Sequence, residues 1–312
     1  MNRIVFITVI CGVCAMMMGC RDNSPCPDGM KRIGGPPPED VEQWCVNSGS
    51  PSGGMKQGPY FSWYADGKKK EEGAYQDDNK VGVWTRFFKD GKKAHTVNYV
   101  DGKQDGEWLK WNDKGTKIQQ GKYVNGERQG VWTDWFDDGT KKTEGTWKNN
   151  KGDGLWVRYY PNGKKKSENM FRNDAPDGKA VHYYESGQKQ MEGINRRGKF
   201  EGKWTAWYEN GNLKDIGTWA NGKPNGRWQY FNKQGKLIKE GDYLNGQREG
   251  VWSYYTGDGS VAKAPMYKNG KELTEEEAAA AKEAEAAAKE APAEAAPAPE
   301  KKAPAAPAKK SE

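Results

Sequence analysis

Few residues of this 312-residue chain have the types and spacing that chemistry requires. The two histidines, His95 and His182, stand at unrelated places in the chain, and we expect surface residues rather than metal ligands. The sequence contains no phosphate-binding loop, no nucleophile elbow and no Cys/His cluster with metal-ligand spacing. Its glycine-rich fragments follow turns rather than open helices, which excludes a dinucleotide site. The sequence therefore predicts a protein that is not an enzyme and that holds no cofactor or metal.

The N-terminus predicts export. A short basic start is followed by an uncharged stretch at 4–19, which is short for a membrane span and suits a signal peptide at 1–19. The segment ends Met17-Met18-Gly19-Cys20 and resembles a bacterial lipobox. That resemblance implies cleavage before Cys20 and a diacylglyceryl group on its thiol, with a plain secretory signal as the alternative. Arg21, where an Asp would favour retention at the inner membrane, predicts the outer membrane.

Two cysteines follow Cys20, in a Pro- and Gly-rich segment with almost no periodicity. Export implies an oxidising compartment, so we predict a Cys26–Cys45 disulfide that ties down a loop within a tether at 20–57. Closing a loop of this length is worth about 3 kcal/mol in loop entropy. A metal site is the alternative, disfavoured by only two thiols and no nearby histidine.

The body of the chain is a repeat with a period of 24 residues. Numbering each unit from its first glycine as position 0, a second glycine stands at +9 in every unit, and tryptophans recur at +2, +5 and +17. Such periodicity indicates a repeat architecture, here of nine units at 58–273. The first glycines of units one to nine are Gly58, Gly82, Gly106, Gly130, Gly154, Gly178, Gly202, Gly226 and Gly250.

Each unit predicts two strands and two turns. Asp/Asn-Gly pairs at +8/+9 favour a two-residue type I′ hairpin turn, in which paired positions sum to 17. Trp132 then lies opposite Gly145 and Trp147 opposite Gly130, so that an aromatic ring covers each bare glycine. A second Asn-Gly pair, at +19/+20, turns the chain into the next unit. Positions +2 and +5 fall on opposite faces of a regular strand, which requires a bulge or aromatic packing on both faces.

This pattern resembles the bacterial variant of the MORN repeat. A close instance is Gly130-Val131-Trp132-Thr133-Asp134-Trp135-Phe136 with Asp138-Gly139 and Glu144-Gly145-Thr146-Trp147. The resemblance covers 58–270. With the repeat pattern it predicts an all-β fold: an elongated single-sheet meander of nine hairpin repeats. MORN-type repeats serve as membrane-associated scaffolds, and relatives of the bacterial variant are often labelled antitoxins.

Unit six departs from the pattern. Ala180 replaces the tryptophan at +2 and Asn195 the aromatic residue at +17, and just before them Asn169 replaces the glycine at +15. Two interpretations stay open: neutral drift in a redundant array, or a kink or partner groove.

Six consecutive units carry a lysine at +11. We expect these lysines to form a ladder with steps of about 9.5 Å, two strands per unit. One interpretation is a solvated face balanced by acids at +14; the other is a groove for phospholipid headgroups, lipopolysaccharide or an acidic protein. Nucleic acid is not expected for an exported protein. The ladder lysines are Lys69, Lys93, Lys117, Lys141, Lys165 and Lys189.

The C-terminus is separate from the repeats. Thr274 and Glu277 match a capping box, and the Ala/Glu/Lys run that follows predicts a helix at 274–291. A Pro/Ala/Lys tail at 292–312 is predicted to be disordered. Together these features predict a non-enzymatic, lipid-anchored protein of the bacterial cell envelope whose sheet is a binding or scaffolding surface. Its partners would be the membrane, through the anchor, and an unknown protein or anionic envelope component. The alternative is an antitoxin or immunity-like protein that neutralises a toxin.

Overall fold

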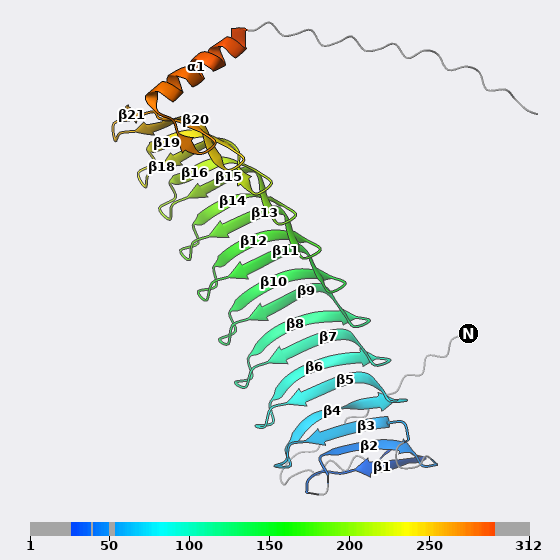
Figure 1. Ribbon diagram of the computed structural model, residues 1–312. Coiled ribbons are helices and arrows are strands. Elements are labelled where there is room, and N and C mark those ends of the chain that lie inside the picture. Colours follow the sequence, from blue (N-terminus) through cyan, green and yellow to red (C-terminus); the bar gives the residue numbers. More distant parts are fainter. Residues whose placement is uncertain (1–25, 39, 50–53, 291–312) are drawn as a thin grey trace, which may run out of the picture.

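The computed structural model describes residues 26–38, 40–49 and 54–290. The predicted signal peptide, Cys20 and the tail at 292–312 lie outside the described residues. The described chain forms one long antiparallel sheet of 23 strands, followed by the helix α1 (Figure 1). Consecutive strands lie side by side from β1 at one end of the elongated molecule to β20 and β21 near the other. The predicted all-β, single-sheet meander is confirmed.

The elements follow one another in chain order. They are β1 Met30–Gly34, β2 Glu42–Asn47, β3 Gln57–Trp63, β4 Lys69–Gln76, β5 Asn79–Phe87, β6 Lys93–Val100, β7 Lys103–Trp111, β8 Lys117–Val124, β9 Glu127–Trp135, β10 Lys141–Lys148, β11 Lys151–Tyr159, β12 Lys165–Arg172, β13 Ala175–Tyr183, β14 Lys189–Arg196, β15 Lys199–Trp207, β16 Leu213–Ala220, β17 Lys223–Pro224, β18 Gly226–Phe231, β19 Leu237–Leu244, β20 Gln247–Tyr255, β21 Val261–Lys263, β22 Met266–Lys268, β23 Lys271–Glu272 and α1 Glu275–Glu290. Two repeat strands are interrupted. One interruption is at Asn225, between β17 and β18, and the other is at Ala264-Pro265, between β21 and β22, where proline offers no N–H to the ladder.

The register within each hairpin is the predicted one, but the turn is not. Trp132 pairs with Gly145 and Gly130 with Trp147. The turn has three residues rather than two: Gly139 N donates to Phe136 O (2.9 Å), and Phe136 N donates to Thr140 O (2.8 Å). Only Gly139 has a positive φ there (88°), and the register shifts between Lys141 and Thr143. This is a type I turn with a bulge, which Asp/Asn-Gly also suits.

Two-residue turns with positive φ at both positions occur at the other end of each hairpin. Asn125 and Gly126 have φ values of 52° and 85°, and the flanking Val124 and Glu127 are paired. Asn, Asp and Gly tolerate this left-handed conformation best, which explains their recurrence at +19/+20.

Of the two solutions that the sequence left open for +2 and +5, the sheet uses aromatic packing on both faces; its bulge lies on the partner strand and leaves +2 and +5 on opposite faces. The extra residue at +12 is a bulge, and the aromatic residues pack on both faces. Trp132 lies on one face, which we call the tryptophan face. Trp135 lies on the opposite face beside Lys141, its register partner. We call this second face the lysine face.

The tryptophans do not cover the glycines predicted. The ring of Trp132 lies 2.1–2.6 Å from where a Cβ on Gly121 would stand, so it covers the preceding unit and not Gly145. Its Nε1 donates to the carbonyl of Lys122 (3.2 Å). The cause is a bulge between units: Gln120 pairs with Thr133 but Lys122 with Gln129, which leaves Gly121 opposite three residues. The same packing joins Gly73 to Trp84, Gly121 to Trp132, Gly145 to Trp156, Gly193 to Trp204, Gly217 to Trp228 and Gly241 to Trp252.

Aromatic side chains at +17 complete this core. Tyr123 meets Trp132 edge-on with ring centroids 5.0 Å apart, and Trp147 meets Trp156 in the same way at 5.3 Å. Edge-to-face pairs of this kind contribute about 0.5–1.5 kcal/mol beyond the area that they bury. A single-layer sheet therefore has a core of stacked aromatic residues, not of aliphatic ones.

The N-terminal segment is more ordered than the sequence suggested. Cys26 and Cys45 are joined by a disulfide with Cα atoms 5.7 Å apart. The segment between them is not a loop: β1 and β2 form a hairpin, and β2 pairs with β3. Cys45 is 1% exposed. The hairpin extends the sheet beyond the first repeat, where backbone pairing with β3 supplies the order that its Pro/Gly-rich sequence does not indicate.

The predicted C-terminal helix is confirmed as α1. Thr274 N donates to a carboxylate oxygen of Glu277 (2.8 Å), and Glu277 N donates to Thr274 Oγ1 (3.2 Å), which is the reciprocal geometry of a capping box. Within the described residues, no helix has the length and apolar character needed to cross a bilayer.

Candidate binding surface

The ladder lysines stand in a row on the lysine face. Each begins a strand directly after a three-residue turn: β4, β6, β8, β10, β12 and β14 all start with one of them. The structure therefore aligns the six residues that the sequence selected.

Most of these lysines are already engaged within the sheet. Four form ion pairs with the acid at +14 of their own unit, as in Lys141–Glu144 (2.7 Å). Lys117 donates instead to Gln120 Oε1 (2.7 Å), and in unit two the residue at +14 is a threonine, so that Lys93 lacks this carboxylate. The four ion pairs are Lys69–Glu72, Lys141–Glu144, Lys165–Glu168 and Lys189–Glu192.

Three of these lysines, Lys117, Lys141 and Lys189, also contact an aromatic ring of the next unit. Lys117 Nζ lies 4.7 Å from the ring centroid of Trp135, and Lys189 Nζ lies 5.3 Å from that of Trp207. Such cation–π contacts contribute about 0.5–1 kcal/mol at exposed sites. The ladder thus links neighbouring units while it keeps its contact with water.

The pKa shifts agree with ion pairing in the folded state. The hydrogen bond to Glu144 raises the pKa of Lys141. Burial alone would raise the pKa of Glu168, but hydrogen bonds from Lys165 and Tyr183 outweigh it and hold that pKa below its usual value. The raised pKa of Lys141 and the lowered pKa of Glu168 both favour the charged form at neutral pH. A solvated face balanced by acids describes the four paired lysines, and little free positive charge remains along the ladder.

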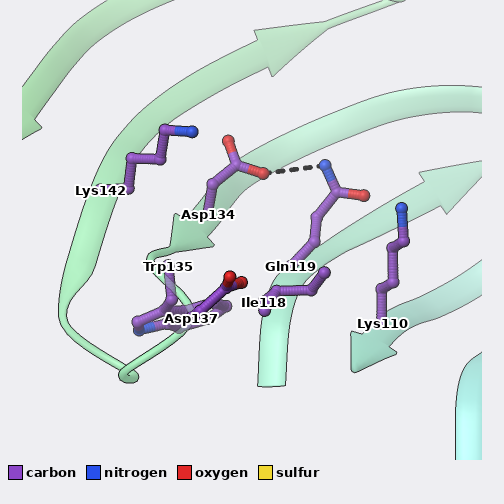
Figure 2. Close-up of a pocket in the computed structure, with 7 residues that line it drawn as sticks. All are labelled: Lys110, Ile118, Gln119, Asp134, Trp135, Asp137 and Lys142. Carbon is purple, nitrogen blue, oxygen red and sulfur yellow. Dashed lines mark hydrogen bonds between the residues drawn. The ribbon is translucent and has the colours of Figure 1, made fainter. Parts of the chain in front are cut away.

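A shallow hollow of about 270 Å³ lies near the three-residue turns of units three and four. Figure 2 shows Lys110 and Lys142 on either side of a hydrogen bond from Gln119 Nε2 to Asp134 Oδ1 (2.8 Å). Trp108 Nε1 donates to the other side of the same amide, at Gln119 Oε1 (2.9 Å). The polar groups at the centre of this hollow are thus paired with one another, and we assign it no chemistry.

A second hollow, of about 260 Å³, lies on the lysine face of units five and six. Leu155, Met170 and Val181 form its apolar wall, and Lys179 stands at its rim. The lysine–glutamate ion pairs of these units contribute the remaining polar groups. This surface is a recess with apolar walls on an open sheet.

Unit six keeps the register of its neighbours. Ala180 pairs with Gly193, as the residues at +2 and +15 do in other units, so the departures cause no break in pairing. Ala180 is 0% exposed, and its neighbour Asn169 occupies the place where other units need glycine. The two departures therefore belong together, because an alanine at +2 brings no ring that would exclude a side chain at 169.

The histidines are half-buried, not surface residues as expected. His95 stacks on Trp108 with ring centroids 5.1 Å apart. Burial, followed by the charges of Arg86, Lys110 and Lys80, lowers the pKa of His95. Burial and Arg158 lower that of His182 in the same way. In the part of the chain that the structure describes, no group of three or more His, Cys, Asp or Glu residues is placed to hold a metal ion.

Sequence reasoning missed a set of exposed aliphatic residues on the lysine face. Positions +1 and +16 pair across each hairpin. In units four to six, four of these six positions carry large aliphatic side chains, as in the pair Leu155–Met170, and the other two carry Thr146 and Lys179. The recurrence of aliphatic residues at +1 was the available signal. It was weak, because position +1 varies among valine, leucine, proline, lysine, arginine and glutamate.

Fold and surface define an open, single-sheet β-repeat protein with accessible faces. The family model of the MORN repeat variant matches five segments, at 56–77, 152–173, 176–194, 200–221 and 224–245. The chain therefore contains MORN repeats of the variant type, as its tryptophan and glycine spacing predicted.

Similarity to solved structures adds no argument, because every TM-score is low. Complexes named TcdB2-TccC3-Cdc42 and TcdB2-TccC3 are 12% and 11% identical, with TM-scores of 0.18 and 0.15. The alignments cover 75% and 73% of this chain but span only 15% and 17% of those chains. A protein of unknown function from Bacteroides fragilis is 9% identical over 61% of this chain and 95% of its own, with a TM-score of 0.10. No curated protein shows a significant match.

Proposed function

We propose that this protein is a non-enzymatic lipoprotein of the bacterial cell envelope whose repeat sheet is a binding or scaffolding surface. One observation carries the proposal: a single-layer sheet leaves its lysine face open and exposes large aliphatic residues on it, such as Val131, at 57% exposure. Apolar side chains gathered on an open face indicate an interaction surface. The MORN-repeat family supports the same role. The partner is a protein or an anionic envelope component.

Two features of the N-terminus support placement in the envelope. The sequence before Cys20 resembles a lipobox, and the Cys26–Cys45 disulfide suits an oxidising compartment. Since Cys20 precedes the hairpin β1–β2, an anchor there would hold one end of the elongated sheet at the membrane. The sheet would then extend from the surface with its faces accessible. Arg21 favours the outer membrane.

Metabolic labelling tests the anchor. Cells grown with an alkynyl fatty acid should label the wild-type protein, and Cys20→Ser should remove the label. The protein should fractionate with outer membranes, whereas Cys20→Ser should be released in soluble form. A label of equal intensity on the variant would refute lipidation at Cys20.

Site-directed photocrosslinking in intact cells tests the surface. A photoreactive residue at position 131 or 155, on the exposed lysine face, should give a discrete crosslinked species. The same residue at Gly257, in an exposed turn, is the matched control. Equal yields at the face and at the turn would contradict a specific binding surface.

A further inference from the structure

The exposed aliphatic residues gather on the lysine face of units four to six. Val131, Leu155, Met170 and Ile194 are 57%, 46%, 37% and 53% exposed. We call these four residues the aliphatic patch. In units seven and eight the same positions carry Lys203, Thr218, Arg227 and Asp242. At +1 exposed valines also occur in units two and nine, Val83 and Val251. Among the nine units, exposed large aliphatic residues at +16 occur in units five and six, Met170 and Ile194, so this part of the patch is local.

Two residues of the patch line the hollow described above. Leu155 and Met170 are register partners and form part of its wall, and the buried Val181 lies beside them. Val181 stands at position +3 of unit six and is buried. Units two and four carry a buried threonine at this position, Thr85 and Thr133. This part of the lysine face offers an apolar recess for an incoming side chain.

A row of cations flanks the patch on the side of the two-residue turns. Two residues beyond Met170 and Ile194 on the same strands stand Arg172 and Arg196, so all four side chains share a face. The cationic row consists of the exposed residues Lys148, Lys151, Arg172, Arg196 and Lys199.

The cationic row is costly for folding. Lys148 pairs directly with Lys151, and Arg196 with Lys199. Like charges opposite one another destabilise a sheet, so the arrangement has no benefit for the isolated fold. The equivalent pairs in units one and eight, Gln76–Asn79 and Leu244–Gln247, carry no charge.

Acids near the row reduce its charge but do not cancel it. Asp153, Asp177 and Glu201 lie on the neighbouring positions of β11, β13 and β15. Glu201 accepts a hydrogen bond from Asn221 N (3.0 Å) and is thus tied to a turn. On β9 the corresponding position carries the exposed Glu127, so that five cations face four acids. On the opposite flank Lys141, Lys165 and Lys189 are neutralised by their own glutamates. Free positive charge therefore borders the patch on one side.

We propose that the aliphatic patch and the cationic row bind an acidic amphipathic helix of a partner protein. This rests on the proposed function and names the partner of that surface. The helix would place aliphatic side chains on the patch and carboxylates over the cationic row. One helical turn rises about 5.4 Å and strands lie about 4.8 Å apart, so successive turns of a helix laid across the strands meet successive strands. The six strands β9–β14 span about 24 Å, which corresponds to about 16 helical residues.

A protein helix suits this surface better than a bilayer does. Membrane-interface sites favour Trp and Tyr among their exposed residues. Here the four exposed patch residues are Val, Leu, Met and Ile, and the aromatic residues of the lysine face, such as Trp135, stand at +5 beside the ladder lysines.

Peptide binding to the purified full chain tests the proposal. The probe is a labelled helical peptide of about 16 residues, with leucines along one face and glutamates along one flank, and binding is measured by fluorescence anisotropy. A second peptide carries lysines in place of the glutamates. We expect the acidic peptide to bind at least about tenfold more tightly than the basic one, and its affinity to fall as salt is raised.

Paired variants separate the patch from the ladder. L155D/I194D and R172E/R196E should each weaken binding of the acidic peptide about tenfold or more. K93Q/K117Q in the ladder of units two and three, and K223E/K271E at the start of β17 and β23, should leave it within about twofold. Unchanged circular dichroism spectra show that a variant is folded. If the charge-reversal variant R172E/R196E is not folded, R172Q/R196Q is used in its place.

Three outcomes would overturn the proposal. The first is that the acidic and basic peptides bind equally well. The second is that L155D/I194D binds the acidic peptide as tightly as the wild-type protein does. The third is that phosphatidylglycerol vesicles bind in a way that depends on Arg172 and Arg196 while the acidic peptide does not bind. Cys20 labelling is independent of all three. A failed labelling experiment refutes the anchor, and a failed peptide experiment refutes the helix.

Discussion

At the scale of single residues, the fold depends on which glycines face a tryptophan. In units two and five a side chain replaces the glycine at +15, and both cases support this dependence. Val97 occupies a +15 position, and the following Trp108 donates its Nε1 to the Gln119 side chain instead of a backbone carbonyl. Asn169 occupies another, and there the tryptophan is replaced by Ala180. A side chain at +15 is therefore compatible only with a displaced or absent indole.

Gly145→Ala tests this dependence. The atoms of Trp156 stand 2.3–2.6 Å from where a Cβ would lie, so the ring must move. We expect a loss of about 1–3 kcal/mol in the free energy of unfolding, measured by urea denaturation followed by tryptophan fluorescence. Gly257→Ala, where no atom lies within 4 Å, is the control. Trp156→Ala should abolish the difference between glycine and alanine at 145; a difference that persisted would place the cost elsewhere.

Asp215 should make the stability of the fold depend on pH with a sign opposite to that of a carboxylate in an ordinary ion pair. Burial raises its pKa, and neighbouring Lys214 only partly offsets this. A carboxyl group whose pKa is higher folded than unfolded destabilises the fold while ionised, and the penalty disappears as pH falls through the folded pKa. Asp215→Asn should therefore raise the urea midpoint at pH 7 and leave it unchanged near pH 3. The exposed Asp113→Asn is the control, and a gain independent of pH would exclude this cause.

At the scale of strands and turns, the 24-residue period of the sequence predicted the pairing register within each hairpin. It did not determine the geometry of the turns and bulges. Trp132 and Gly145 pair as the 24-residue spacing predicts. The turn at Asp138-Gly139 was predicted wrongly, because the same dipeptide suits both a two-residue turn and a three-residue turn with a bulge.

The ion pairs of the ladder illustrate the same limit. In a regular strand Lys141 and Glu144, three residues apart, would face opposite sides. The bulge at Lys142 brings them to one face. A bulge has no distinct residue signature in this sequence, so neither these ion pairs nor the ring of Trp132 over Gly121 could be derived from it. The aliphatic patch was not predicted for a different reason: its residues depart from the repeat pattern, and the prediction was based on that pattern.

The helix α1 depends on its first turn. Thr274→Ala removes the acceptor for Glu277 N and should cost about 1 kcal/mol of helix stability. Loss of helical signal in circular dichroism, with the strand signal unchanged, is the expected result. Thr274→Ser keeps the hydroxyl and should preserve the helix. Equal loss in both variants would show that the capping box does not hold the helix start.

At the scale of the whole molecule, stability is local because each strand contacts its neighbours. A sheet of 23 strands with consecutive pairing has interfaces between adjacent units and two ends, so its stability approximates a sum along one dimension. The ends are then the weakest parts. At one end β22, β23 and α1 follow the last unit, and at the other the hairpin β1–β2 covers the first repeat and is held by the Cys26–Cys45 disulfide.

Reduction of that disulfide should loosen one end and leave the array intact. Hydrogen exchange measured by mass spectrometry should show faster exchange in β1–β3 after treatment with a thiol reductant, while exchange in β11 and β12 stays unchanged. The reason is that β2 contacts only β1 and β3 among its strand partners, whereas each interior strand is held on both sides by full-length neighbours. The variant C26S/C45S should match the reduced protein, and a reductant-treated C26S/C45S sample controls for effects of the reagent. If exchange rose equally along all units, the sheet would unfold as one cooperative body and the local description of its stability would be wrong.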